Sequence, residues 1–185
     1  MIGAAFTSMR LRFAGLCDDH RGVALIEFAF AVPILTLLFV GGYQLSDALF
    51  AYRKVTLATR TISDLTSRYT KVSDADLDMI LNASQQVMSP YSPSAATMTV
   101  SQIDIDTNKK GIVSWSRGKN SSGLVKNSEF TLPEAMKQPN TSLIVSQIIY
   151  TYRPGIASKV FGTFAMKEQM IMSPRASQTI VLDNT

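Results

Sequence analysis

The pattern of apolar positions begins with an almost unbroken run over residues 23–43. A single charged residue, Glu27, interrupts this run. At a rise of about 1.5 Å per residue, a helix over the run is about 30 Å long, which matches the hydrocarbon core of a bilayer. The pattern therefore predicts one membrane-spanning helix.

Beyond the run the pattern becomes amphipathic, because apolar residues recur at intervals of three and four. This stripe is predicted to face a folded domain and consists of Leu45, Leu49, Tyr52, Val55, Thr59, Ile62, Leu65 and Tyr69. The opposite side carries the charged residues Asp47, Arg53, Lys54, Arg60, Asp64 and Arg68. No proline or glycine lies between Tyr43 and Tyr69, so we predict one continuous helix over residues 23–69.

The rest of the chain predicts an α+β fold. Ser73 and the acids after it indicate the capped start of a second helix that ends near residue 89. Residues 97–105 and 112–116 alternate as strands of a hairpin, and residues 141–152 are too apolar for an edge strand. Residues 164–173 and 179–182 are further candidate strands, residues 132–136 a helical turn, and residues 117–128 a solvated basic loop. We expect one further helix and a largely antiparallel sheet of three to five strands.

Charge indicates how the chain is oriented and divided. Arg10, Arg12 and Arg21 precede the apolar run, which places the N-terminus in the cytoplasm by the positive-inside rule. We expect a leader over 1–22, a transmembrane and extended helix over 23–72, and a periplasmic α+β domain over 73–185. The protein would then cross the inner membrane once. From residue 23 onward, 15 basic residues face 12 acidic ones, and this balance predicts no nucleic-acid partner.

The residues available for chemistry argue against an enzyme. The only cysteine, Cys17, and the only histidine, His20, both lie in the leader, so the later chain lacks the residues of nucleophile–histidine pairs and of zinc sites. The acids at 74, 76 and 78, and those at 104 and 106, imitate calcium-ligand spacing, but Met79 and Lys109 occupy the glycine position. We interpret them as helix-cap and hairpin residues and expect no metal and no cofactor. A hydrolase using Asp104 and Asp106 remains formally open.

Three interpretations of the apolar run remain. It could be a signal peptide cut near residues 46–48, although such peptides have shorter apolar regions. It could be an uncleaved signal anchor, which leaves Glu27 unexplained. The third interpretation depends on the junction, where a basic leader ends at Gly22, Val23 opens the helix, and Glu27 is the fifth residue after the glycine.

This junction resembles the cleavage site of type IV prepilins. The resemblance implies that a membrane-embedded prepilin peptidase cuts between Gly22 and Val23 on the cytoplasmic face and methylates the new N-terminus. It further implies that Glu27, then the fifth residue of the mature chain, meets the N-terminal amine of a neighbouring subunit in the filament.

Three later segments, VSWSRG, TSLIVSQIIYTYRP and MSPR, extend the resemblance to the TadE-like proteins over the chain from Arg21 to about Arg175. These are minor pilins or pseudopilins of the tight-adherence (Tad/Flp) type IV pilus machinery, which builds an adhesive pilus. The resemblance implies a role in assembly, by priming or capping the pilus, and partners among other pilins and inner-membrane platform proteins. The alternative is a signal-anchored periplasmic binding module that uses the hairpin and residues 117–128 as its ligand surface.

Overall fold

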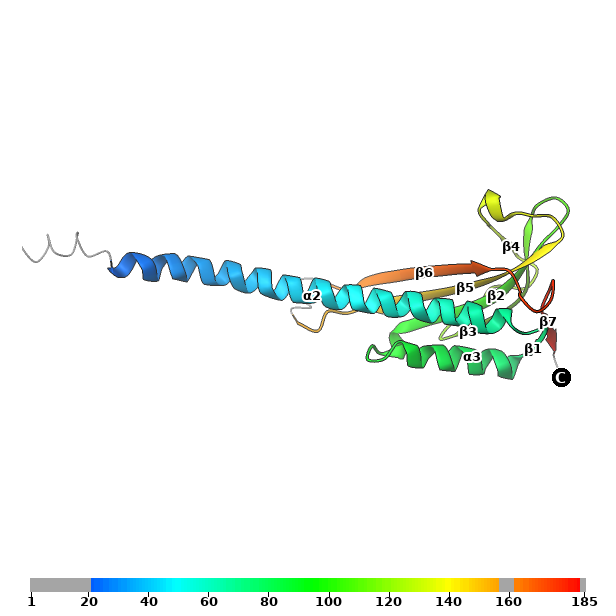
Figure 1. Ribbon diagram of the computed structural model, residues 1–185, viewed down its shortest axis with the longest axis horizontal. Helices are drawn as coiled ribbons and strands as arrows, with labels where there is room; N and C mark the ends of the chain where they lie inside the picture. Colours follow the sequence, from blue (N-terminus) through cyan, green and yellow to red (C-terminus); the bar gives the residue numbers. More distant parts are fainter. Residues whose placement is uncertain (1–20, 157–161, 184–185) are drawn as a thin grey trace, which may run out of the picture. The chain divides into compact units, whose positions relative to one another are not determined.

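The computed structural model describes residues 21–156 and 162–183 of the protein (Figure 1). Cys17, His20 and most of the predicted leader lie outside these residues. The chain forms two compact units, one that ends at Leu45 and one that begins at Ser46. The expected division at residues 22 and 72 stays a prediction.

The predicted long helix is confirmed as α2, which runs from Arg21 to Ser67. Pro33 lies inside it and cannot donate a backbone hydrogen bond. Three residues later, the Thr36 hydroxyl donates to the carbonyl oxygen of Val32 at 2.8 Å. This polar side chain in the apolar run is therefore satisfied within its own helix.

The second unit confirms the α+β class. After α2 come β1 (Lys71–Ser73), α3 (Asp74–Val87), the 3₁₀ turn η1 (Pro93–Ala95), β2 (Ala96–Ile105), β3 (Gly111–Lys119), β4 (Glu129–Phe130), the turn η2 (Glu134–Met136), β5 (Thr141–Tyr152), β6 (Phe164–Met172) and β7 (Val181–Asp183). Five strands form an antiparallel sheet in the order β4-β3-β2-β5-β6. The predicted β2–β3 hairpin and the interior position of β5 are confirmed. The short strands β1 and β4 were not predicted, and β1 pairs with β7 in parallel.

The predicted capping of the second helix is also confirmed. The Ser73 hydroxyl accepts a hydrogen bond from the backbone N–H of Asp76 at 3.2 Å, and the Asp76 carboxylate accepts one from the Ser73 N–H at 2.9 Å. These reciprocal bonds form a capping box. The hydrogen bonds from Ser73 hold the pKa of Asp76 below its usual range.

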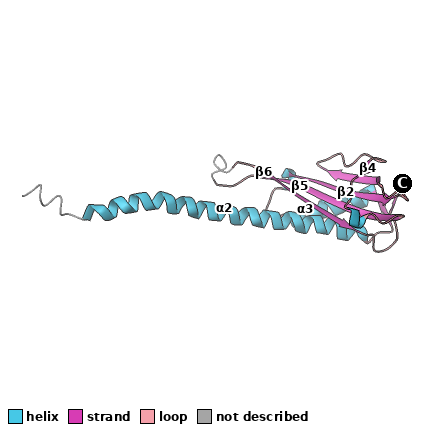
Figure 2. Cartoon of the chain, turned by 90° about the horizontal axis from the view of Figure 1, so that it is seen from above, coloured by secondary structure: helices cyan, strands magenta, loops and turns pink. Residues whose placement is uncertain are grey.

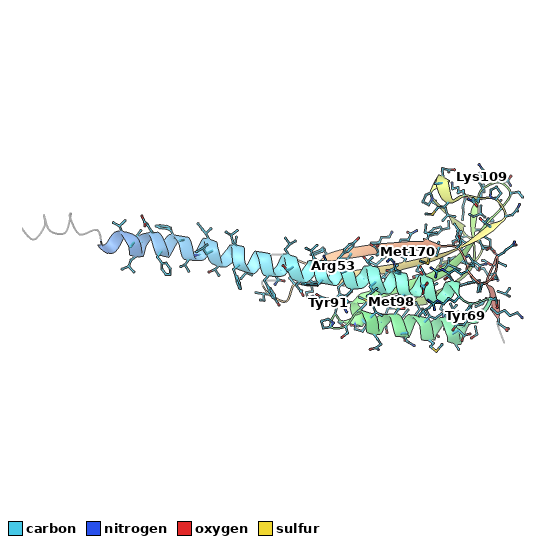
Figure 3. The ribbon with its side chains drawn as sticks, in the orientation of Figure 1. Arg53, Tyr69, Tyr91, Met98, Lys109 and Met170 are labelled. Atoms are coloured by element: carbon cyan, nitrogen blue, oxygen red, sulfur yellow. The ribbon has the colours of Figure 1, made fainter. Side chains whose placement is uncertain are left out.

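The sheet and the two helices form two layers with the main apolar core between them (Figures 1 and 2). Met98, labelled in Figure 3, is fully buried in this core. A smaller apolar cluster covers the other face of the sheet and includes Ile103, Val113 and Leu143. Strand β3 contributes side chains to both the main core and the smaller cluster because it contains a β-bulge. Trp115 pairs with Gln102, while Val113 pairs with Ile103. The extra residue, Ser114, places Trp115 and Val113 on opposite faces.

The buried side of α2 differs from the predicted stripe. Val55, Thr59 and Ile62 are fully buried as expected, but Leu49 and Tyr52 are 55% and 44% exposed, and Leu45 is exposed as well. Small residues take their place in the interior, namely Ala51, Ala58, Ser63, Thr66 and Ser67. At close-packed density, small residues fill the places on the helix where large side chains of the sheet approach closely, while Val55 and Ile62 fill the remaining space.

The last segment of the chain is held against the end of α2 and the sheet. The backbone N–H of Arg175 donates to the carbonyl oxygen of Ser67 at 2.8 Å, which satisfies one of the free carbonyls at the helix end. The indole N–H of Trp115 donates to the carbonyl oxygen of Ile180 at 2.9 Å. These bonds fix residues 175–183 beside the core although they are distant from it in sequence.

Candidate functional site

The predicted cleavage residues lie in the first turn of α2. Gly22 is exposed, and Val23 is 48% exposed. A Cβ atom placed on Gly22 would have no other atom within 4 Å. The fold of the described residues therefore does not require glycine at this position. Cleavage after Gly22 stays a prediction.

Glu27 lies one helical turn beyond Val23 and is exposed. Within the part of the chain that the structure describes, its carboxylate has no hydrogen bond and no ion pair. Apolar side chains surround it along the helix, with Leu25 73% and Phe28 65% exposed. An unpaired carboxylate in such a segment is costly in hydrocarbon, so its presence calls for a partner outside these residues.

The apolar run exposes nearly all its side chains, and Phe39, for example, is 77% exposed. Among the described residues, α2 is the one helix long and apolar enough to cross a membrane. Large apolar side chains on every side of a helix are stable in lipid and unfavourable in water. The helix therefore suggests a single-pass membrane anchor.

Asp47, the second residue of the second unit, has a role that the sequence did not reveal. It was predicted to lie on the charged, solvated side of the helix, but it is half-buried and its carboxylate accepts hydrogen bonds from the hydroxyls of Tyr91, at 2.8 Å, and Tyr152. Burial and then the hydrogen bond to Asp47 raise the pKa of Tyr152. Burial and the nearby Asp47 charge likewise raise the pKa of Tyr150. Asp47 therefore attaches α2 to the domain.

Arg117 also differs from its predicted place in a solvated loop. It belongs to β3, and its guanidinium donates two hydrogen bonds to the Asp78 carboxylate at 2.9 and 2.6 Å. Asp74 lies 3.4 Å from a third nitrogen. The hydrogen bonds from Arg117 lower the pKa of Asp78. These contacts of Arg117 with Asp78 and Asp74 join α3 to the sheet.

The acidic residues with calcium-like spacing have structural partners. Asp76 caps α3, Asp104 accepts a hydrogen bond from Gln102 at 2.9 Å, and the Asp106 carboxylate accepts one from the backbone N–H of Lys110 at 2.8 Å. The cap and hairpin interpretations are therefore confirmed. The described residues contain no group of three metal-ligating side chains.

Together these features define a class of protein, an α+β domain that follows one membrane-length apolar helix. Residues 22–63 match the family model described as TadE-like protein, which confirms the predicted resemblance over this segment. This match is consistent with a TadE-like protein of the Tad pilus system. That family is structural rather than catalytic. No curated protein and no solved structure gave a significant match.

Proposed function

We propose that the protein is a minor pilin or pseudopilin of a Tad/Flp-type pilus. A prepilin peptidase cuts it between Gly22 and Val23, and the mature chain then acts in pilus assembly with other pilins and platform proteins, by priming or capping the filament. The chain crosses the inner membrane once, with its N-terminus in the cytoplasm and its α+β domain in the periplasm.

One observation carries this proposal: the segment that matches the family begins at Gly22 and includes Val23 and Glu27. The predicted cleavage residue is therefore the first matched residue. The fold leaves open space around Gly22, so we attribute the glycine to an enzyme that must bind the extended backbone at this point.

The chemistry of Glu27 follows from this cut. Cleavage creates an α-amine with an ordinary pKa of about 7.7–8.0, so the new N-terminus is largely cationic at neutral pH. The N-terminal end of a helix also favours a nearby anion. In an assembled filament, Glu27 of one subunit and the amine of its neighbour neutralise each other, which offsets the cost of placing either charge in hydrocarbon.

The outward side of α2 in the second unit supports a role in helix packing. Leu49, Phe50 and Leu57 are all more than half exposed although they lie beyond the apolar run. Arg53 and Lys54 lie between Phe50 and Leu57, so this side of the helix offers exposed apolar side chains together with two positive charges to a partner. Helices of neighbouring pilins are the partners that we propose for it.

Replacing Gly22 with leucine is expected to block cleavage and leave the fold intact. Leucine has open space at this position and a higher helix propensity than glycine by about 1 kcal/mol, whereas its side chain would obstruct binding of the junction in a protease cleft. The measurement is the mass of the protein purified from membranes that contain the peptidase. The unaltered chain should begin with N-methylated Val23, and the G22L chain should keep Met1.

Gly41→Leu is the matched control, because Gly41 lies in the same helix and a Cβ there also meets no atom within 4 Å. Its N-terminus should be processed normally. An unaltered chain that keeps Met1 would instead support the uncleaved, signal-anchored binding module, and a chain cut near residues 46–48 would identify a signal peptide. Either result would contradict the proposal.

Glu27→Ala is expected to leave processing intact but reduce incorporation into pili by about tenfold or more. The neighbour's amine would then be buried without its counter-charge, and a loss of about 1.4 kcal/mol already gives a factor of ten. Thr36→Ala is the control, because the Thr36 hydroxyl has its partner within α2. Both variants are scored by the ratio of protein in sheared pili to protein in membranes. Equal incorporation of E27A and the unaltered chain would exclude the proposed pairing.

A further inference from the structure

Strand β6 is an open edge of the five-stranded sheet. It ends the strand order, and its backbone pairs with β5 alone among the described residues. Figure 1 shows it along the outer border of the sheet. Such an edge presents a row of unpaired N–H and C=O groups that can accept another strand.

The two halves of β6 differ in how they are protected. The first half carries Lys167 and Glu168, and the Tyr52 hydroxyl of α2 donates to the Glu168 carboxylate at 2.8 Å. Charges on an edge strand discourage pairing with other chains. The second half, Met170 to Met172, has no charge and is half-buried. The C-terminal end of the edge, Met170 to Met172, is therefore the apolar part that lacks this protection by charge.

A cavity of about 440 Å³ lies beside this part of β6 on the face of the sheet that carries α2. Met170 and Met172 of β6 and Leu57 and Leu65 of α2 provide its apolar lining. Figure 3 labels Met170 next to α2. Methionine side chains adapt to ligands of different shape, so this lining suits an apolar side chain of a partner.

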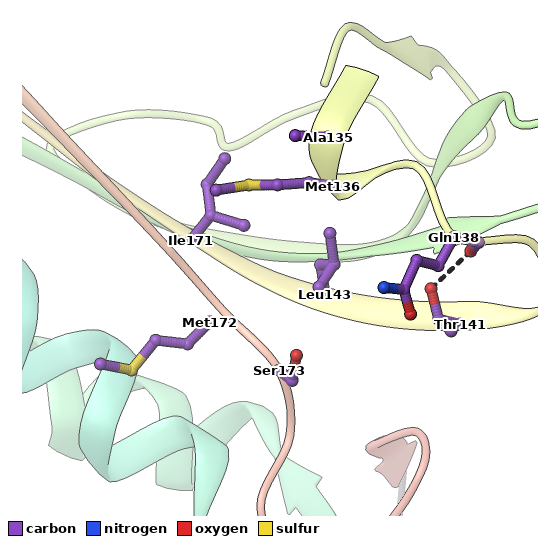
Figure 4. Close-up of a pocket in the computed structure, with 8 residues that line it drawn as sticks. All are labelled: Ala135, Met136, Gln138, Thr141, Leu143, Ile171, Met172 and Ser173. Atoms are coloured by element: carbon purple, nitrogen blue, oxygen red, sulfur yellow. Dashed lines mark hydrogen bonds between the residues drawn. The ribbon is translucent and has the colours of Figure 1, made fainter. Parts of the chain in front are cut away.

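A second cavity, of about 240 Å³, lies on the opposite face of the same strand end. It is lined by Ile171, by Leu143 of β5 and by Met136 of η2 (Figure 4). Figure 4 also shows the side chains of Ile171 and Met172 pointing to opposite sides of the strand. An extended chain paired with β6 would direct alternate side chains to the two faces, and each face offers a cavity.

The charge beside the first cavity is positive. Asp64 binds both Arg68 and Arg175, the latter at 2.8 Å, so one carboxylate serves two guanidinium groups. Arg60 also lines the cavity and has no ion pair among the described residues. A partner with carboxylates would complement this surface, whereas a second copy of the chain would bring the same excess of positive charge.

We propose that the second half of β6, with its two flanking cavities, binds an extended acidic peptide segment of another protein as an additional strand. Backbone hydrogen bonds to β6 hold the segment, its alternate apolar side chains enter the two cavities, and a carboxylate pairs with Arg60. In strand addition of this kind, hydrogen bonds to the extended backbone provide affinity and pockets for alternate side chains provide specificity. The inference does not depend on cleavage at Gly22.

The test uses the full chain in detergent micelles and a fluorescein-labelled probe peptide, EVVTVVE, whose valines point to both faces of an extended strand, with polarisation as the readout. Two further peptides carry N-methyl groups on alternate backbone nitrogens, one in each of the two possible registers. A β6 edge bonds only one set of alternate N–H groups, so one pattern should weaken binding by about tenfold or more and the other should not. The basic peptide KVVTVVK should bind more weakly than EVVTVVE.

The matched pair of protein variants is Arg60→Glu and Arg53→Glu, because both arginines lie on α2 but Arg53 does not line either cavity. R60E should weaken binding of EVVTVVE by about fivefold or more, and R53E should leave it unchanged. Hydrogen exchange should show peptide-dependent protection of Met170 to Met172.

The proposal would be overturned by equal effects of the two N-methylation patterns or of the two variants, or by no binding at about 1 mM peptide. Protection of β6 without peptide that rises with protein concentration would instead identify a second copy as the occupant, and protection that changes with the detergent would identify an apolar additive.

Discussion

Replacing Gln102 with alanine is expected to lower the free energy of unfolding of the second unit by about 3–5 kcal/mol. Gln102 is 1% exposed, and its amide nitrogen donates to Asp104 at 2.9 Å and to the Thr179 hydroxyl at 2.7 Å. Its carbonyl oxygen accepts the backbone N–H of Ile180 at 2.8 Å. Alanine would remove all three bonds, leave a buried N–H without a partner and create a cavity.

The C-terminal segment should be affected first, because Gln102 and Trp115 hold it against the sheet. Urea unfolding of the full chain in detergent, followed by far-UV circular dichroism and by the fluorescence of Trp115, the only tryptophan, measures the change. Gln169→Ala is the control, since Gln169 is an exposed glutamine of β6. Its stability should change by less than about 0.5 kcal/mol. A midpoint for Q102A equal to that of Q169A would contradict the role of Gln102.

Alkaline pH is expected to destabilise the second unit through Tyr152 and Tyr150. Burial raises the pKa of both phenols in the folded state, with Asp47 adding to the effect. In the unfolded chain these phenols lose their protons near pH 10. The stabilisation is therefore fully present below pH 10 and is lost as the pH rises toward the folded pKa values. Each such tyrosine lowers the free energy of unfolding by about 1.4 kcal/mol per pH unit above that point.

The slope of stability against pH between about pH 10 and 11 separates this effect from the titration of lysines. Tyr152→Phe should reduce the slope by about 1.4 kcal/mol per pH unit, because the Tyr152 phenol is removed. Asp47→Asn keeps a hydrogen-bond acceptor and removes the charge, so the slope should become intermediate. Urea unfolding at each pH, followed by circular dichroism, gives these values. Identical slopes for Y152F and the unaltered chain would show that the Tyr152 phenol titrates normally in the folded protein.

Local sequence signals predicted the helices well because their physical causes are local. The apolar run and the absence of a later breaker predicted α2 to within two residues at each end. Ser73 and Asp76 predicted the start of α3, since the capping box involves residues only three positions apart. The apolar sequence of β5 predicted an interior strand, because a strand buried on both faces needs few polar residues.

The burial of α2 was predicted less well because spacing identifies a face but not how closely a sheet approaches it. Leu49 and Tyr52 fitted the periodic stripe, yet Ala51 and Ala58 are the residues that are buried. The short strands β1 and β4 had no signal of their own, since β1 forms only by pairing with the distant β7. The bulge at Ser114 depends on the register between β2 and β3, so the sequence of either strand alone does not predict it.

The candidate sites divide in the same way. Gly22, Val23 and Glu27 were predicted from the sequence because that prediction depends only on their order along the chain, and the structure adds that their surroundings are open. The roles of Asp47, Gln102 and Arg117, and the cavities on both sides of β6, follow only from the tertiary structure. They bring together residues that are distant in sequence, for example Asp47 and Tyr152, which are 105 positions apart. By itself, the sequence determined the long apolar helix, the single charged residue Glu27 within it and the α+β class. The tertiary structure decided which polar groups are buried and which strand is an open edge of the sheet, because both depend on contacts between distant segments.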